Sequence, residues 1–200
     1  MGKIFYVMGK SSSGKDTIYN MLLNDEELGL KNIVGYTTRP MREGEENGRE
    51  YIFVRENRLD ELKSQGKVIE SRVYDTVYGK WYYFTVNDEQ INLGQDHYIL
   101  IGTLDSYEKV RDFYGKDESG TTIVVPIYIN VEDGERLLRA IQREKSQKEP
   151  KYAEMCRRFL ADCEDFSEEK IKHAQIEKIY ENHNLTECYE KIRKEIKKYI

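Results

Sequence analysis

A run of seven residues near the N-terminus has the composition and spacing of a loop that binds phosphate. Gly9-Lys10-Ser11-Ser12-Ser13-Gly14-Lys15 matches the pattern GxxxxGK, between an apolar run at residues 4–8 and a helical pattern at residues 16–23. In that context the glycines let backbone N–H groups turn toward phosphate oxygens, and the start of the helix adds positive charge. Lys15 would reach the β- and γ-phosphates. The alternative is a Ser/Gly turn with a lysine at the start of a helix.

The residue after the lysine departs from the usual pattern. Asp16 stands where a Ser or Thr normally binds Mg²⁺, and Thr17 follows it. A carboxylate is a good hard-oxygen ligand for Mg²⁺, and it is also favourable at a helix N-terminus. Asp16 is therefore a candidate metal ligand, with a purely helix-starting role as the alternative.

A second group of residues could hold another phosphate. The loop-like stretch at residues 36–51 carries three arginines, and Arg39 and Arg42 flank a stiffening proline. Guanidinium groups match phosphate oxygens bidentately, so these two arginines with a tyrosine hydroxyl would suit a monophosphate. Glu70 follows an apolar pair and is a candidate for pointing into a cleft. A charged surface loop with a satisfied glutamate is the alternative.

The composition limits the function classes. The net charge of -5 does not favour nucleic acid or an anionic membrane, and no stretch approaches the length of a membrane span. Three cysteines without a CxxC pair, and three histidines without metal-ligand spacing, argue against structural zinc. We expect a cytoplasmic protein with reduced thiols.

The order of patterns along the chain predicts an α/β fold. Short apolar runs alternate with helical patterns, which is typical of a mainly parallel sheet with helices on both faces. Residues 36–85 differ, because short strand-like pieces surround one small helix, and we expect an inserted β-rich subdomain there. The stretch at residues 143–152 is charged and weakly apolar, and it indicates a mobile loop or lid.

Over nearly its whole length the chain resembles the guanylate kinase family. The resemblance rests on the phosphate loop, on TTRPMREGE at residues 37–45, on NGREYIF at 47–53, on VIE at 68–70, and on Tyr78-Gly79 and Asn182. It implies a P-loop three-layer α/β/α fold of one domain, with a core at residues 1–35, 86–135 and 165–200, a monophosphate-binding subdomain at 36–85 and a helical lid at 136–164. It also implies Mg²⁺-assisted phosphoryl transfer from ATP to GMP, by a monomer or a homodimer without nucleic acid or membrane partners.

The resemblance also implies roles for single residues. The catalytic candidates are Lys15, Arg39 and the lid arginines Arg139, Arg143 and Arg158, which would neutralise charge on the transferring group. The ATP-binding candidates are Gly9, Ser11, Ser12, Ser13, Gly14, Lys15, Asp16, Thr17 and Asn182. The GMP-binding candidates are Arg39, Arg42, Tyr51, Glu70, Tyr78, Gly79 and Thr103, with Glu70 accepting hydrogen bonds from guanine N1–H and the amino group.

Four residues depart from the family pattern. Gly35 replaces a serine that touches the base, Ile101 and Thr103 replace two aspartates, and Lys80 replaces a small hydroxyl residue. We expect weaker discrimination between bases as a result. Two other functions stay open: a kinase of the same architecture with another acceptor, such as a sugar bisphosphate, and a non-catalytic binding module.

Overall fold

The computed structural model of the protein describes residues 1–42, 44–76 and 79–200. Its central sheet has the strand order β2-β7-β1-β8-β9, and every neighbouring pair is parallel. The strands are β1 (Ile4–Met8), β2 (Lys31–Asn32), β7 (Tyr98–Gly102), β8 (Val124–Asn130) and β9 (Ile179–Glu181). Strands of a parallel sheet that is covered on both faces read as continuous apolar runs. All five residues of β1 are buried, as this rule requires.

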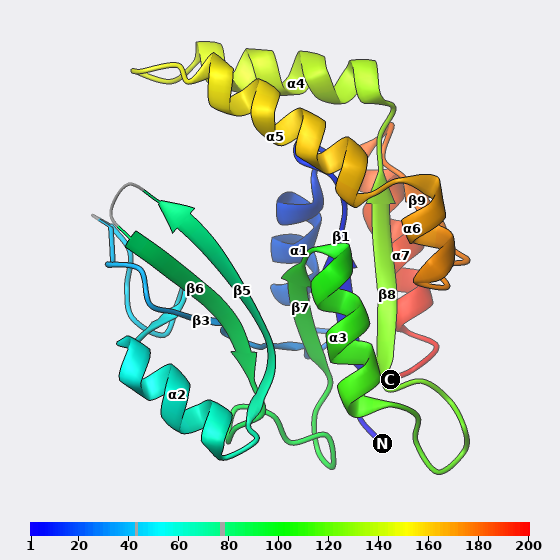
Figure 1. Cartoon of the computed structure of the whole chain (residues 1–200). Coiled ribbons are helices and arrows are strands. Elements are labelled where there is room, and N and C mark those ends of the chain that lie inside the picture. The colour runs from blue at the N-terminus through cyan, green and yellow to red at the C-terminus, as the bar shows by residue number, and fades with distance from the viewer. Residues whose placement is uncertain (43, 77–78) are drawn as a thin grey trace.

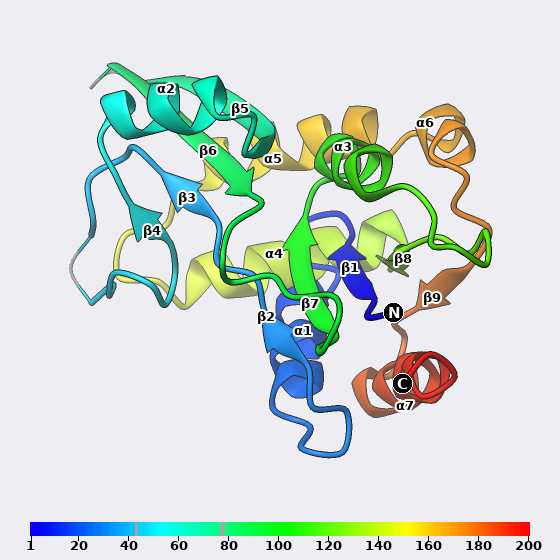
Figure 2. The ribbon, with the colours of Figure 1, turned by 90° about the horizontal axis from the view of Figure 1, so that it is seen from below.

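Helices cover both faces of this sheet, so the core has three layers (Figure 2). On one face, α1 (Lys15–Leu23) and α7 (Leu185–Ile196) pack against Phe5 and Val7 of β1. On the other face, α3 (Leu104–Tyr114) and the segment around α6 (Glu168–His173) pack against Tyr6 and Met8. Alternate residues of β1 therefore pack into two separate apolar layers, one on each face of the sheet.

A second sheet of four strands stands beside the core, with the order β4-β3-β6-β5. Its strands are β3 (Tyr36–Thr37), β4 (Ile52–Phe53), β5 (Val68–Thr76) and β6 (Gly79–Val86), and α2 (Glu56–Ser64) packs on it through Leu59 and Leu62. The antiparallel β5–β6 hairpin brings Glu70 opposite Thr85 and Arg72 opposite Tyr83. Strands β5 and β6 are much longer than the short strand-like pieces that the sequence indicated for this region.

Two further helices, α4 (Asp133–Lys145) and α5 (Tyr152–Asp165), pack on each other beyond the carboxyl end of β8 (Figure 1). The carboxyl ends of parallel strands are where α/β proteins bind ligands. The phosphate loop at residues 9–15 follows β1 and lies at the same edge. No helix within the described ranges has the length and apolar composition that a membrane crossing demands.

The packing of α7 on the sheet predicts a large effect of one truncation. Ile192 is fully buried among the side chains of the α1/α7 layer. We expect Ile192→Ala to lower the free energy of unfolding by about 2–5 kcal/mol, because it removes buried methyl groups and leaves a cavity. Urea denaturation measures the change. Ile200→Ala, at a residue that is largely exposed, is the matched control and should change little.

Candidate active site

The phosphate loop is held in a tight turn by close backbone contacts. Gly14 adopts φ of 82°, and a Cβ there would lie 2.5 Å from Nδ2 of Asn182. The same Nδ2 donates a hydrogen bond of 2.8 Å to the carbonyl of Ser13. A Cβ at Gly9 would lie 2.3 Å from the carbonyl oxygen of Ile129. Both positions therefore require glycine for steric reasons. Asn182, in the segment after β9, holds the loop in place through its hydrogen bond to Ser13.

Several groups of the loop are free to meet a ligand. Within the described ranges, the buried hydroxyl oxygens of Ser12 and Ser13 have no hydrogen-bond partner. Lys15 and Asp16 open α1, with Nζ of Lys15 3.0 Å from Oδ2 of Asp16, and Thr17 is exposed beside them. A helix N-terminus with a lysine and unpartnered hydroxyls provides donors for several phosphate oxygens.

The carboxylate of Asp16 suits a magnesium ion that is bound together with a nucleotide. Its side chain is 78% exposed, so one oxygen remains open beside the ion pair with Lys15. No cluster of three or more His, Cys, Asp or Glu side chains among the described residues could hold a metal by itself. Mg²⁺ commonly takes one or two carboxylates and completes its shell with phosphates and water. The residues present fit that mode of binding.

Helices α4 and α5, which we call the lid after the segment expected from the sequence, contact both the backbone N–H and the carbonyl of Ser11 in the phosphate loop. Oδ2 of Asp162 on α5 accepts a hydrogen bond of 2.8 Å from the backbone N–H of Ser11. Nη1 of Arg136 on α4 donates to the Ser11 carbonyl at 2.9 Å and lies 3.6 Å from Asp162. The carboxylate of Asp162 thus already binds one backbone N–H of the phosphate loop.

The three lid arginines all face this region. Nη2 of Arg158 lies 3.4 Å from Oγ of Ser11, and Nη2 of Arg139 donates to the Asn182 carbonyl at 3.2 Å. Arg143 and Arg158 line a cavity of about 330 Å³ between the lid and the loop, which we call the lid cavity. Arg42 reaches the same cavity from the loop between β3 and β4. The fold therefore brings together cations that lie up to 116 residues apart in the sequence, from Arg42 to Arg158.

Arg39 has a different setting, because an internal carboxylate already satisfies it. The residue is only 4% exposed, and its two terminal nitrogens lie 2.7 Å and 2.5 Å from the oxygens of Glu45. Its guanidinium also stacks over the rings of Tyr51 and Phe53. The hydrogen bonds from Arg39 lower the pKa of Glu45 to about 2. A phosphate bound by Arg39 would have to replace this carboxylate.

Two cavities adjoin each other between the core and the second sheet. The inner cavity, of about 370 Å³, is lined by Tyr6, Asp16, Arg49, Arg72, Thr85 and Ser106 among others. The outer cavity, of about 610 Å³, extends from Lys15 and Thr103 to Arg157 and Arg158 of the lid. Both are lined by Tyr51, Arg72, Tyr83 and Gly102, so they share a wall.

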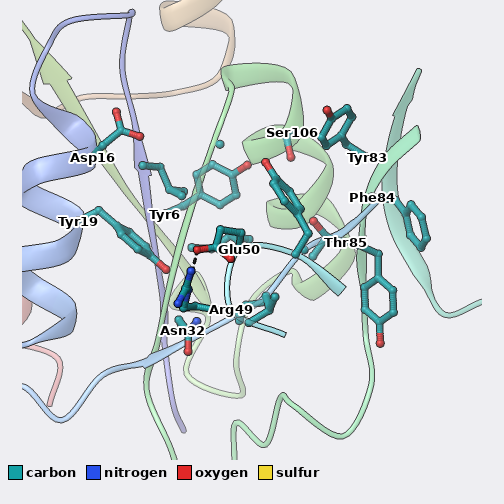
Figure 3. A pocket seen from close by; sticks show the side chains of 18 of the residues that line it. Tyr6, Asp16, Tyr19, Asn32, Arg49, Glu50, Tyr83, Phe84, Thr85 and Ser106 are labelled. Carbon is teal, nitrogen blue, oxygen red and sulfur yellow. Dashed lines mark hydrogen bonds and ion pairs between the residues drawn. The ribbon is translucent and has the colours of Figure 1, made fainter. Parts of the chain in front are cut away.

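The floor of the inner cavity carries polar groups on an apolar scaffold. Figure 3 shows Asp16 and Tyr19 of α1 on one side of it, and Tyr83, Phe84 and Thr85 of β6 on the other. Tyr6 of β1 lies between them, with Ser106 as a hydrogen-bond partner. Burial raises the pKa of Tyr6 well above its ordinary value, so its hydroxyl stays protonated even in alkaline solution.

Glu70 lies behind the wall of this cavity. Its carboxylate accepts hydrogen bonds from Oγ1 of Thr85 at 2.8 Å and from Nε of Arg72 at 3.1 Å. Gly35 and Ile101, two of the positions that depart from the family pattern, line the same cavity. Thr103 caps the N-terminus of α3, and Gly79 begins β6 with φ of 103°. Tyr78 lies outside the described residues.

Comparison with known proteins agrees with this arrangement. The family model described as guanylate kinase matches residues 1–199. The chain belongs to the guanylate kinase family. The P-loop α/β fold and the family membership that the sequence predicted are thereby confirmed.

Individual guanylate kinases show how far the similarity extends. The chain is 27% identical to guanylate kinase from Porphyromonas gingivalis over 203 residues, which cover 100% of this chain and 99% of that protein. It is 40% identical over 79 residues to the enzyme from Rhodopseudomonas palustris strain CGA009, where the match covers 39% of this chain and only 36% of the relative. A crystal structure of guanylate kinase from Anaplasma phagocytophilum superposes with a TM-score of 0.64 at 21% identity, over 98% of this chain and 85% of that one.

Within this family frame, sequence reasoning missed several charged residues of the site. Arg72 and Arg49 line the inner cavity, and Arg157 lines the outer one. Arg72 had a usable signal, because it follows Glu70 by two residues on a strand and therefore points to the same face. The contact of Asp162 with Ser11 had no such signal, since the two residues lie 151 positions apart in the sequence.

The position of Asp162 predicts that it competes with nucleotide phosphates. We expect Asp162→Asn to tighten ATP binding by roughly threefold to tenfold, because the neutral amide weakens a charge-assisted bond to the loop. Isothermal titration with a non-hydrolysable ATP analogue measures this affinity. Glu164→Gln, an exposed charge change on the same helix, is the control. Unchanged or weaker binding by Asp162→Asn would contradict the interpretation.

The Arg39–Glu45 pair predicts a pH-dependent contribution to stability. The pKa of Glu45 falls from 4.5 to about 2 on folding, so the stabilisation is complete above pH 4.5 and disappears as the pH falls toward 2. Urea denaturation from pH 2 to pH 7 should show wild type more stable than Glu45→Gln at neutral pH, with a gap that closes below pH 4.5. A gap that is independent of pH would exclude this origin. Exposed Glu149→Gln serves as the control.

Proposed function

We propose that the protein transfers the γ-phosphoryl group of ATP to GMP, giving ADP and GDP. The observation that carries the proposal is the pair of adjoining cavities, the outer one reaching the phosphate loop and the inner one reaching Arg72, which pairs with buried Glu70. Two nucleotides bound in them would meet at the shared wall near Gly102. Family membership supports the same reaction.

The donor side rests on the phosphate loop. Backbone N–H groups of residues 11–17 and the Lys15 ammonium would bind the β- and γ-phosphates of ATP, and Asn182 supports the loop by its bond to Ser13. Mg²⁺ bound with ATP would neutralise phosphate charge, and the Asp16 carboxylate is the group of this chain that would hold it.

Charge stabilisation is the main catalytic task in phosphoryl transfer, since the reaction passes through a loose transition state. Lys15, Arg139, Arg143 and Arg158 are the cations that would stabilise the transferring group. Approach of the lid and the second sheet would exclude water, which otherwise hydrolyses ATP. No covalent intermediate and no strong base are needed.

Binding of the acceptor nucleotide would require Arg39 to exchange its present partner, Glu45, for a phosphate. The phosphate of GMP would replace Glu45 on Arg39, because both ligands offer two oxygens to the guanidinium. Arg42, Tyr51, Tyr78, Gly79 and Thr103 complete the proposed acceptor site. Glu70, as an acceptor-only carboxylate, suits the N1–H and amino donors of guanine. We expect the enzyme to act in the cytoplasm, as a monomer or a homodimer.

A coupled assay of ADP formation with MgATP and a panel of nucleoside monophosphates tests the function. We expect GMP to be the best acceptor, and Lys15→Met to lower kcat about 100-fold or more, because it removes a cation from the transferring phosphoryl group. Lys194→Met, an exposed position on α7, is the matched control. Turnover of a sugar bisphosphate in place of GMP would move the proposal to the related kinase, and no turnover of any acceptor would favour the binding module.

A further inference from the structure

Arg72 and Glu70 form an ion pair on the face of β5 that is turned toward the core. The two residues are separated by one position, so their side chains leave the strand on the same side. That side packs against α3, and Tyr6 of β1 is close enough for both charges to act on its hydroxyl. The pair therefore lies where the second sheet meets the core.

The two members of the pair differ in their access to the cavities. The Glu70 side chain is 0% exposed, whereas 26% of the Arg72 side chain is exposed. Oxygens of Glu70 engage Nε of Arg72 at 3.1 Å and Nη2 at 3.4 Å, which uses one edge of the guanidinium. Arg72 lines both the inner and the outer cavity. It is thus oriented by a buried carboxylate and presented to the ligand space.

The chemistry of Arg72 matches one group of a purine edge. A guanidinium only donates hydrogen bonds, so Arg72 offers donors to the ligand space, while Arg72 and Thr85 hold both oxygens of buried Glu70. Guanine presents an acceptor to such donors at O6, beside its N1–H donor. Adenine reverses both groups, with an acceptor at N1 and an amino donor at C6. Arginine is also the usual partner of guanine O6 and N7 in nucleic-acid recognition.

We propose that Arg72 determines base specificity by donating hydrogen bonds to O6 of the guanine in the acceptor nucleotide. This role rests on the proposed GMP acceptor and explains how selectivity survives the changes at other positions. Gly35 and Ile101 line the same cavity and have no side-chain polar group. Arg72 supplies a charged donor beside Glu70 at this wall.

The test compares kcat/KM for GMP, IMP and AMP at saturating MgATP in wild type and Arg72→Met, which keeps the length of the side chain and removes its donors. IMP retains O6 and N1–H and lacks only the amino group. We expect losses of about 10–100-fold for GMP and IMP alike, mainly through KM, and little change for AMP. The preference for GMP over AMP should fall by the same factor.

Two further variants make the outcome specific. Arg72→Lys keeps the charge that balances buried Glu70 and loses the guanidinium fork, so it should fold and recover only part of the GMP preference. Arg58→Met makes the matched change at an exposed arginine of α2 and should leave all three substrates unaffected. Thermal melting of each variant separates a folding defect from a loss of recognition.

Three results would overturn the role of Arg72. An equal loss for GMP, IMP and AMP would indicate contact with the phosphate. An unchanged GMP-to-AMP ratio in Arg72→Met would exclude recognition of O6, and full recovery in Arg72→Lys would exclude a requirement for the guanidinium of Arg72. Absence of GMP turnover by the wild type would instead refute the proposed function, and this inference with it.

Discussion

The hydrogen bond from Asn182 to the carbonyl of Ser13 is the contact on which the rest of the site depends. The phosphate loop turns so sharply after β1 that a Cβ on Gly14 would clash with Asn182 and a Cβ on Gly9 would clash with Ile129. A buried carbonyl without a donor is costly, and Asn182 supplies the donor from the far end of the chain. Because the lid also contacts Ser11 and Asn182, the position of the loop sets the position of the lid arginines.

Two arginines and one backbone N–H of the site are already bound by carboxylates of the protein itself. Glu45 pairs with Arg39, Glu70 pairs with Arg72, and Asp162 accepts the N–H of Ser11. Anion binding at such a site is an exchange of carboxylate for phosphate and not a capture by bare charges. The exchange lets a chain with a net charge of -5 maintain a cationic site without broad attraction for polyanions.

Much of the fold followed from local patterns. The apolar run of β1, the glycine spacing and the alternation of strands with helices are properties of neighbouring residues, and they predicted the loop and the parallel sheet. The partners of Arg39 and Arg72 depend on which rotamers and strand register the whole fold selects. Arg39 could therefore be named as a phosphate ligand without Glu45 being foreseen, and Arg72 was not identified from the sequence at all. The length of the β5–β6 hairpin could not be predicted from the sequence either, because half-exposed strands rich in Tyr and charged residues lack a continuous apolar run.

Tyr6 and Gly102 meet at the floor of the inner cavity, where a Cβ on the glycine would lie 2.1 Å from the tyrosine hydroxyl. The ring of Tyr6 fills the space that a side chain on the next strand would need, so neither position can change alone without a clash or a void. Two substitutions that are separately harmful and jointly tolerated form an epistatic pair. The depth of the inner cavity is thereby set by Tyr6, and the affinity of any small molecule shaped to this floor would depend on that one residue.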